Sequence, residues 1–463
     1  MSRNRSVTQD GREAGRDERI LIVGAGLVGS LLSIYLARRG LRVEVYDRCS
    51  DPRLVDLSAQ RSSINLSLCE RGFKALDRVG IGNAVRACCV PSYGRLIHDE
   101  HGGVVFQPYG DNGECTYAIL RNDLNRVLID FAEKSFGVAF RFDERCLDLE
   151  PTTTTVQFED AKTGLVHNEE ATRVFGADGV FSKIRSRLER LPRFNYSQLY
   201  LDHGYSELNM PSIEGVPWAD QRLSVHLWPR GGYLLLGLPN LDGSIVCSLH
   251  LPLEGEPSFG ALRTERDLLR FLSNSFPDAV DYMPNAVADF FGHRINYLVT
   301  IRCFPWTFDG RVALIGDSAH AIVPFFAQGV NAGFEDCLVL DDCLEEHGFD
   351  WRAVFNAYQT RRKPDADAVS DLSLHHFNEL RDSVGKPTFH LKKRIEKRLS
   401  ELDPERFVSL YSMVTFKATP YAEALRRGRE LEALIQRIME TPAIADKTEI
   451  ELNRLIDQAV AAV

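Results

Sequence analysis

The chain has 463 residues, enough for two or three domains, and its 44% hydrophobic and 26% charged residues are typical of a globular protein. Its formal net charge of -10 offers no basic surface to a nucleic acid and disfavours contact with an anionic membrane. The ten cysteines include no CxxC pair and no zinc-type spacing, so we expect no metal site and interpret them as free thiols of a cytoplasmic protein.

The N-terminal segment, MSRNRSVTQDGREAGRDER, contains no apolar core. We therefore expect residues 1–19 to form a disordered leader, and neither a signal peptide nor a membrane anchor. No stretch of the sequence approaches the roughly eighteen consecutive apolar residues of a membrane-spanning helix. The sequence therefore predicts no transmembrane segment.

Residues 20–47 follow the pattern of an apolar strand, a glycine turn, an amphipathic helix and a second strand. In the motif GxGxxG, Gly24 permits the tight turn, Gly26 lets a pyrophosphate approach the backbone, and Gly29 lets the helix pack on the strand. Asp47 ends the second strand, where it can accept a hydrogen bond from a ribose hydroxyl. This unit predicts a dinucleotide site for either a flavin or a nicotinamide cofactor, and a glycine turn without a ligand is the alternative.

The later elements extend this unit. Helical periodicity occurs at 70–79 and 122–135, and short alternating strands separated by turn residues at 205–253 predict an antiparallel sheet. Strand, loop and helix return after residue 311, and the pattern is helical from residue 351. We predict an α/β fold: a Rossmann-like cofactor domain, an inserted antiparallel β-sheet substrate domain and a helical C-terminal region. The expected boundaries are 20–190 and 301–345 for the two parts of the cofactor domain, 191–300 for the substrate domain and 346–463 for the helical region.

Two segments favour a flavin. GADGVFSKIRSRL at 176–188 and GRVALIGDSAHAIVPFFAQGVNAGFED at 310–336 resemble the second and third FAD signatures of single-component flavoprotein hydroxylases. The resemblance implies that Asp178 supports the pyrophosphate region and that Asp317 binds the ribityl chain, although a strand-end cap is the plainer role for Asp317. Because no second GxGxxG is present, NADPH or NADH is expected to bind transiently. The predicted FAD contacts are Gly24, Gly26, Gly29, Asp47, Arg48, Arg121, Asp178, Asp317, Gly329, Val330 and Asn331.

The resemblance narrows to the kynurenine 3-monooxygenase family. It is carried by SSINLSLCERGFKALDRVG at 62–80, YGRLIHDE at 93–100, HLWP at 226–229 and RFVSLYSMVTFKATPYAEALRRG at 406–428, which are spread over nearly the whole chain. It implies that L-kynurenine is hydroxylated to 3-hydroxykynurenine with O2 and a reduced nicotinamide. The flavin itself is implied to carry the oxygen chemistry, so no catalytic side chain is expected. The implied substrate-binding residues are Arg95, Tyr109, His376, Tyr411, Phe325 and Phe326.

These residue types suit an amino-acid substrate, because an arginine fork binds a carboxylate through two hydrogen bonds and phenols add directed ones. Without the resemblance, Arg95 would be read as a surface arginine. Tyr109 and Tyr411 would be read as core residues.

Several positions depart from the family's pattern. Ser62 replaces an arginine, and the loop PFFAQGVN has Ala327 for a glycine and Val330 for a methionine. His376 replaces an asparagine, unless a one-residue slip places His375 there, and with a reference pKa near 6.5 it would add a charge that asparagine never carries. These changes favour a second possibility, a substituted kynurenine or a related aryl amino acid of secondary metabolism.

Other readings remain open. A halogenase or dehydrogenase could share the scaffold, but FPWTF around Trp306 does not match the halogenase segment WxWxIP. A further alternative, from a different functional class, is a flavin-binding protein without catalytic activity. The C-terminal residues EIELNRLIDQAVAAV are amphipathic and are expected to pack on the protein and not in a bilayer. The apolar residues expected to pack there are Ile450, Leu452, Leu455, Ile456 and Val460.

Overall fold

The computed structural model describes residues 18–54, 64–110, 113–211, 223–382, 387–444 and 447–461. Ser62 and most of the expected leader lie outside these residues. The chain forms two compact units, each assembled from three stretches of sequence. The first unit comprises Met1–Val90, Tyr117–Leu201 and Leu298–Ser370, and the second comprises Pro91–Thr116, Asp202–Tyr297 and Asp371–Val463.

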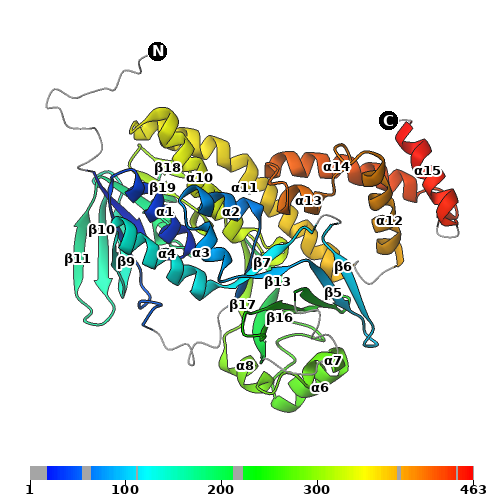
Figure 1. The fold of residues 1–463 in the computed structure, drawn as a ribbon. Coiled ribbons are helices and arrows are strands. Elements are labelled where there is room, and N and C mark those ends of the chain that lie inside the picture. The colour runs from blue at the N-terminus through cyan, green and yellow to red at the C-terminus, as the bar shows by residue number, and fades with distance from the viewer. Residues whose placement is uncertain are drawn as a thin grey trace. The chain divides into compact units, whose positions relative to one another are not determined.

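The first unit is built on a six-stranded sheet in the order β18-β19-β12-β1-β2-β8. Its strands β18 and β19 are labelled in Figure 1. Its neighbouring strands are parallel, except for the antiparallel edge pair β18 and β19. Ile20, Leu21 and Ile22 of the central strand β1 are fully buried, as expected when both faces of a parallel sheet are covered. The sheet confirms the predicted Rossmann-like domain. Its strands are β1 (Arg19–Val23), β2 (Arg42–Tyr46), β8 (Ala139–Arg141), β12 (Arg173–Gly176), β18 (Thr307–Phe308) and β19 (Val312–Leu314).

Helices cover this sheet. α1 packs against α4 and α10, and α10 also packs against α2. The predicted helices at 70–79 and 122–135 are confirmed as α2 and α4. The helices that begin in the first unit are α1 (Leu27–Arg38), α2 (Glu70–Arg78), α3 (Gly82–Arg86), α4 (Arg121–Phe136), α5 (Lys183–Leu188), α9 (Asp317–His320), the 3-10 helix η2 (Pro324–Phe326), α10 (Gly329–His347) and α11 (Trp351–Asp382).

Two three-stranded sheets are also present. The orders are β3-β7-β4 and β11-β10-β9. Their strands are β3 (Asn65–Leu68), β4 (Val90–Ser92), β7 (Thr116–Leu120), β9 (Glu144–Glu150), β10 (Thr155–Asp160) and β11 (Val166–Glu170).

A seven-stranded sheet has the order β17-β13-β16-β15-β14-β5-β6. The predicted antiparallel hairpins at 205–253 are present, and β5 adds a parallel pairing with β14 that the sequence did not indicate. In the second unit, α6, α7 and α8 supply apolar side chains to the core around Trp228 and Leu235. The elements are β5 (Gly94–His98), β6 (Val104–Pro108), β13 (Asn195–Met210), β14 (Val225–Pro229), β15 (Leu234–Pro239), β16 (Ile245–Pro252), β17 (Asn296–Phe304), α6 (Glu265–Ser275), α7 (Pro277–Val280) and α8 (Ala286–Gly292).

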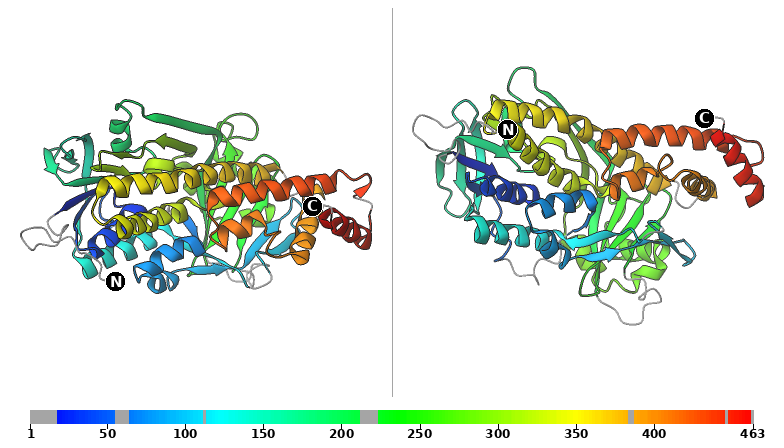
Figure 2. Two further views of the ribbon diagram at one scale, coloured as in Figure 1. Left: turned by 90° about the horizontal axis from the view of Figure 1, so that it is seen from above. Right: turned by 45° about the horizontal axis from the view of Figure 1, so that its top comes forward.

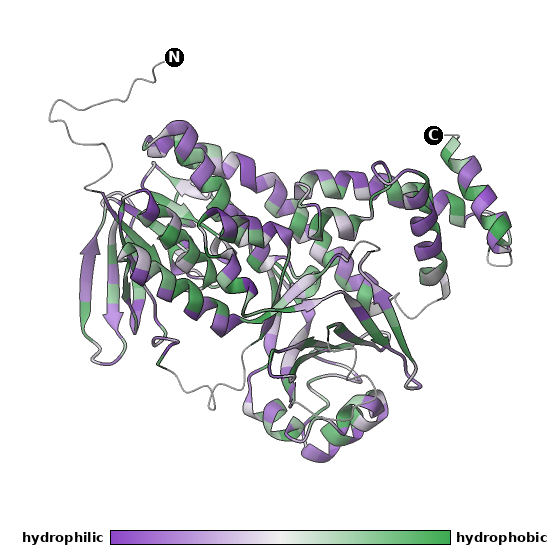
Figure 3. Ribbon diagram, viewed as in Figure 1, coloured by the Kyte–Doolittle hydropathy of each residue, from purple (hydrophilic) through white to green (hydrophobic). Residues whose placement is uncertain are grey.

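The C-terminal helices α12, α14 and α15 form a separate apolar core in the second unit (Figure 2). Hydrophobic and hydrophilic residues alternate around α14 and α15, as expected for amphipathic helices (Figure 3). Leu452 and Ile456 are buried and Leu455 and Val460 are partly buried, but Ile450 is 73% exposed, so the prediction that it packs on the protein was wrong. Ile450 is the second residue of α15 and precedes Leu452, the first buried residue of that helix. The helices are α12 (Pro387–Leu402), α13 (Leu410–Thr415), α14 (Tyr421–Met439) and α15 (Glu449–Ala461).

Among the described residues, no helix combines the length and apolar character required to span a bilayer.

A buried ionic network joins α9, α10 and α11 in the first unit. The carboxylate of Asp336 is fully buried and accepts hydrogen bonds from Arg362 Nε at 2.7 Å and Gly316 N at 3.0 Å, and it lies 2.5 Å from His320 Nε2. Arg362 Nη1 also donates to Glu335 at 2.6 Å. Burial alone would raise the pKa of Asp336, but His320 and Arg362 lower it overall. Asp336, within α10, is therefore held as a carboxylate.

Arg362→Met is expected to lower the free energy of unfolding by about 3 to 5 kcal/mol at pH 7, because it leaves a buried carboxylate without its cation. The loss should narrow only as the pH falls below 3.8, the ordinary pKa of an aspartate, because the stability that wild-type Asp336 contributes is lost as the pH falls through its lowered pKa. Urea unfolding at several pH values measures both effects. Arg361→Met is the matched control, since Arg361 is 42% exposed in a surface pair with Glu346 and should cost less than about 1 kcal/mol. Equal losses in the two variants would contradict this account.

Candidate functional site

The glycine turn between β1 and α1 has the geometry of a phosphate site. Gly24 has φ of 110°, and a Cβ there would lie 2.3 Å from the carbonyl oxygen of Ala177. A Cβ at Gly29 would lie 1.9 Å from the carbonyl oxygen of Gly24, whereas one at Gly26 would meet no atom within 4 Å. Gly26 begins α1 without a side-chain cap. The space beside Gly26 at the start of α1 is therefore open, and an anion placed there would be stabilised by the helix dipole.

Asp47 links this turn to the end of β2. Its Oδ2 accepts a hydrogen bond from Ala25 N at 2.6 Å and its Oδ1 accepts one from Cys49 N at 2.8 Å. Each carboxylate oxygen has a second lone pair, so Asp47 retains capacity for a ribose hydroxyl. The neighbouring Arg48 is exposed.

Asp178 organises the second predicted FAD segment. It accepts hydrogen bonds from Lys183 N and Ser182 Oγ, both at 2.6 Å, and from Ser318 Oγ at 3.1 Å. The first two contacts hold the start of α5, and the third joins this segment to the one containing Asp317. The described contacts of Asp178 thus position the two loops relative to each other.

Asp317 is exposed at the start of α9, three positions after the last residue of β19. The surrounding protein nevertheless removes water from its carboxyl and raises its pKa, while His320 and Arg121 act to lower the pKa. The site thus offers an acceptor, Asp317, with the Arg121 cation near it, which suits a hydroxylated and charged cofactor.

The loop from η2 to α10 carries the third group of predicted contacts. Phe325 and Phe326 are buried in the first unit, and Gly329 and Val330 are half-buried at the start of α10. The first turn of α10 has no acidic residue and no side-chain cap. Its amides are thus suited to an electron-rich ligand group.

Asn331 is fully buried, and its side chain is used by the protein. Its Nδ2 donates to Ser67 O at 2.9 Å and to Ala327 O at 2.8 Å, and its Oδ1 accepts from Cys69 N at 3.1 Å. Asn331 therefore ties the loop to β3 and α2. Ala327 has φ of 52°, in the left-handed region that favours glycine.

In the second unit, the structure brings together four residues that the sequence predicted for substrate binding. Arg95 Cζ lies 4.6 Å from the ring centre of Tyr411 and 5.8 Å from that of Tyr109, and the two rings stack at 5.3 Å. His376 Nε2 lies 3.4 Å from Arg95 Nη2. Burial raises the pKa of Tyr411, so its phenol remains a neutral donor. These residues form the Arg95 cluster, which consists of Arg95, Tyr109, His376 and Tyr411.

Two neighbours of the Arg95 cluster were missed by the sequence analysis. Phe416 lies 5.6 Å from Tyr109 and 5.8 Å from Tyr411, measured between ring centres. Glu379 lies three residues after His376 on α11, and its Oε2 is 3.2 Å from His376 Nδ1. The spacing of three residues on one helix was the available signal for Glu379.

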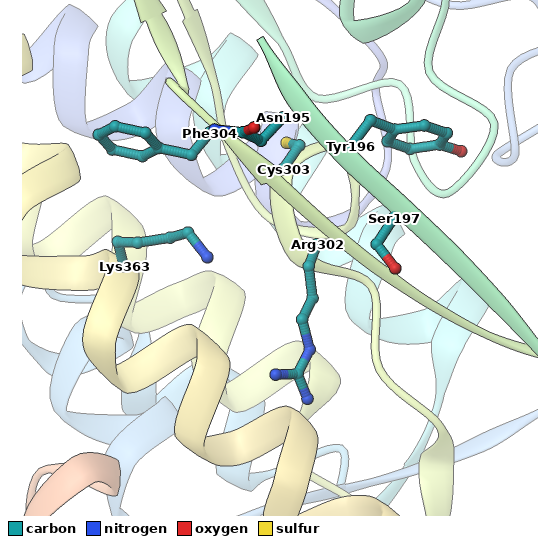
Figure 4. Close-up of a pocket in the computed structure, with 7 residues that line it drawn as sticks. All are labelled: Asn195, Tyr196, Ser197, Arg302, Cys303, Phe304 and Lys363. Carbon is teal, nitrogen blue, oxygen red and sulfur yellow. The ribbon is translucent and has the colours of Figure 1, made fainter. Parts of the chain in front are cut away.

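A surface pocket of about 520 Å³ lies in the first unit. Figure 4 shows Arg302 extending from a strand and Lys363 from a helix, with Phe304 and Tyr196 also lining the pocket. Its lining includes none of the residues that the sequence predicted. Lys363 is paired with Asp367 at 2.6 Å.

Two glycine variants separate folding from cofactor binding. Gly29→Ala is expected to destabilise the protein by more than about 3 kcal/mol, because its Cβ would collide with backbone. Gly26→Ala should keep the thermal stability of the FAD-free protein but weaken FAD binding about tenfold or more, since its Cβ enters the space that a pyrophosphate needs. Thermal unfolding and flavin titration measure the two effects. Normal FAD binding by the Gly26→Ala protein would contradict the assignment of the pyrophosphate site to this turn.

Ala327→Gly is expected to raise the free energy of unfolding by up to about 1 kcal/mol, since glycine removes the left-handed strain. Denaturant unfolding measures the change. The control is Ala353→Gly within α11, which should lower stability by about 1 kcal/mol. Similar losses in both variants would show that the loop does not strain Ala327.

Comparison with known proteins agrees with this geometry. A family profile described as FAD binding domain matches residues 17–201 and 285–373. The chain is 44% identical over 436 residues to the kynurenine 3-monooxygenase of Flavobacterium psychrophilum, covering 94% of this chain and 97% of the relative. It is 41% identical over 437 residues to the kynurenine 3-monooxygenase of Myxococcus xanthus, covering 94% of each.

Among solved structures, 2-methyl-3-hydroxypyridine-5-carboxylic acid oxygenase has a TM-score of 0.64 at 21% identity, covering 81% of this chain and 95% of that one, and this likeness concerns the fold. The two enzyme relatives, which align with nearly the whole chain, confirm the resemblance found in the sequence. The chain therefore belongs to the kynurenine 3-monooxygenase family and carries an FAD binding domain.

Proposed function

We propose that this protein is an FAD-dependent monooxygenase that consumes NADPH and inserts one oxygen atom of O2 into the ring of L-kynurenine, giving 3-hydroxykynurenine. The observation that carries the proposal is the Arg95 cluster, which joins a cation to two phenols within the second unit. The curated relatives named kynurenine 3-monooxygenase support it over nearly the whole chain. The ten free cysteines favour a reducing cytoplasm.

The first unit would hold FAD. The first amides of α1 and the open space at Gly26 suit the pyrophosphate, Asp47 suits a ribose hydroxyl, and Asp317 suits a ribityl hydroxyl. Arg121 and Arg48 add positive charge for the phosphates. Bound FAD, once reduced by NADPH, would supply the activation of O2 and the transfer of oxygen to the ring.

The Arg95 cluster would hold the amino-acid carboxylate of the substrate. Arg95 is half-buried between aromatic rings, where the low dielectric constant strengthens a charge-assisted hydrogen bond. The phenols of Tyr109 and Tyr411 add donors. Fixing the carboxylate restricts the orientation of the attached aromatic ring. Phe325 and Phe326 of the first unit are proposed as further substrate contacts, to the ring.

A second candidate substrate is a substituted kynurenine or a related aryl amino acid. It is favoured by Ala327, whose methyl group lies in the loop that is proposed to contact the flavin, and by His376 in the Arg95 cluster. Both substrates retain the carboxylate that the cluster suits.

NADPH oxidation by the FAD-loaded protein in air is expected to accelerate when L-kynurenine is added. Mass spectrometry should find a product heavier by one oxygen atom, with the label retained when 18O2 is supplied. A bound, reducible flavin that leaves kynurenine unchanged would reject kynurenine as the substrate. Acceleration without a labelled product would reject hydroxylation.

Arg95→Ala is expected to raise the KM for L-kynurenine about 30-fold or more, because it removes a charge-assisted hydrogen bond to the carboxylate in a desolvated site. The same change should alter binding of decarboxylated kynurenine less than about threefold, since that analogue has no carboxylate. Tyr109→Phe serves as a milder variant that keeps the ring and loses only the phenol, with about a tenfold effect. Equal losses for both ligands would place Arg95 away from the carboxylate.

A further inference from the structure

His376 connects an acid to the arginine of the Arg95 cluster. Its Nδ1 lies 3.2 Å from Oε2 of Glu379, and its Nε2 lies 3.4 Å from Nη2 of Arg95. The His376 side chain is only 7% exposed and that of Glu379 is 19% exposed. The imidazole therefore has a partner at each ring nitrogen, one an acceptor and one a donor.

The chemistry of these partners determines where the proton of His376 must lie. A guanidinium has only donors, so Arg95 donates across the contact with Nε2, and Nε2 must carry a lone pair. A neutral imidazole then has its proton on Nδ1, where the carboxylate of Glu379 accepts it. The opposite tautomer would direct an N–H of His376 against an N–H of Arg95.

The surrounding charges favour the neutral ring. Burial lowers the pKa of His376, Arg95 on β5 and Lys393 on α12 lower it further, and Glu379 opposes them without reversing the direction. The ring of Tyr411 on α13 lies 6.2 Å away, between ring centres. Lys392 lies 3.6 Å from Glu379 and 2.7 Å from Glu432 on α14, and Lys393 lies 2.7 Å from Glu396.

We propose that Glu379 is a positioning residue for the Arg95 cluster: by accepting the Nδ1 proton of His376 it fixes the tautomer whose Nε2 holds Nη2 of Arg95. The other N–H groups of Arg95 are then oriented for a carboxylate. This inference rests on the proposed function, in which Arg95 binds the carboxylate of the substrate.

The inference is particular to a histidine at this position. The oxygen of an asparagine side chain accepts a hydrogen bond without the help of a second residue. A histidine accepts at Nε2 only while its proton is kept on Nδ1. Glu379 should therefore matter strongly beside His376 and little beside an asparagine.

A double-mutant cycle tests this dependence with the FAD-loaded protein. Glu379→Gln is expected to raise the Kd and KM for L-kynurenine about tenfold, because the glutamine can donate to Nδ1 and so favour the wrong tautomer. Turnover at saturating substrate should change less than about twofold, as should flavin content and the KM for NADPH. In the His376→Asn background, adding Glu379→Gln should raise the Kd for kynurenine less than about twofold relative to His376→Asn alone.

Two outcomes would overturn the proposal. An equal loss from Glu379→Gln in both backgrounds would mean that Glu379 acts on the substrate or on the fold without His376. Full binding by the Glu379→Gln single variant would mean that the tautomer needs no fixing.

A readout without substrate separates this inference from the proposed function. Nitrogen NMR of 15N-histidine protein, with the His376 signal identified by its absence in His376→Asn, should show the Nδ1–H tautomer in wild type and lose it in Glu379→Gln. An Nε2–H tautomer in wild type would reject the positioning role, whether or not kynurenine binds. If wild type shows the Nδ1–H tautomer but binds no kynurenine, the proposed function fails and the contact between Glu379 and His376 stands.

Discussion

Three parallel strands of the first unit end in the same row, and the cofactor site depends on this register. Val23 of β1 pairs with Gly176 of β12, and Gly176 pairs with Leu314 of β19. The segments that follow these strands come from residues about 24, 177 and 315, yet they start side by side. Ligands of open α/β sheets bind at the carboxyl ends of such strands. The hydrogen bond from Ser318 to Asp178 then joins two of the segments directly.

Acidic residues near this edge have different roles because their surroundings differ. Asp336 is buried and contacts Arg362, Gly316 N and His320, so it links α10 to α11 and to the segment that follows β19. The carboxylate oxygens of Asp178 accept hydrogen bonds from the start of α5 and from Ser318. Asp317 alone of these three is exposed, although its carboxyl is poorly hydrated. All three residues are aspartates, so their different roles follow from the hydrogen-bond partners that the fold places around each of them.

The sequence predicted those features that depend on short spacing. The glycine turn, the two helices at 70–79 and 122–135, and the hairpins at 205–253 are local patterns, and the structure contains each of them. The parallel pairing of β5 with β14 was not predicted, because it joins segments about 130 residues apart and leaves no periodic trace. Burial of Ile450 was predicted wrongly for a similar reason: helical periodicity identifies an apolar face but not where a neighbouring helix begins to cover it. Arg95, Tyr109 and Tyr411 were found only through family resemblance, since nothing in their local sequence distinguishes them from ordinary surface or core residues.

Two of the three departures from the family's pattern that lie within the described residues, Ala327 and His376, have physical consequences that the sequence could not show. Ala327 takes a backbone conformation that favours glycine, and its carbonyl is held by Nδ2 of Asn331, so the loop keeps its course despite the added methyl group. His376 was expected to bring a positive charge to the Arg95 cluster, but burial and the nearby cations lower its pKa and keep the ring neutral. A neutral histidine that accepts from Arg95 resembles an asparagine oxygen in the one property that an arginine requires of its neighbour. The substitution therefore preserves the charge of the cluster, and in our proposal the hydrogen-bond direction that an asparagine would set by itself is set by Glu379.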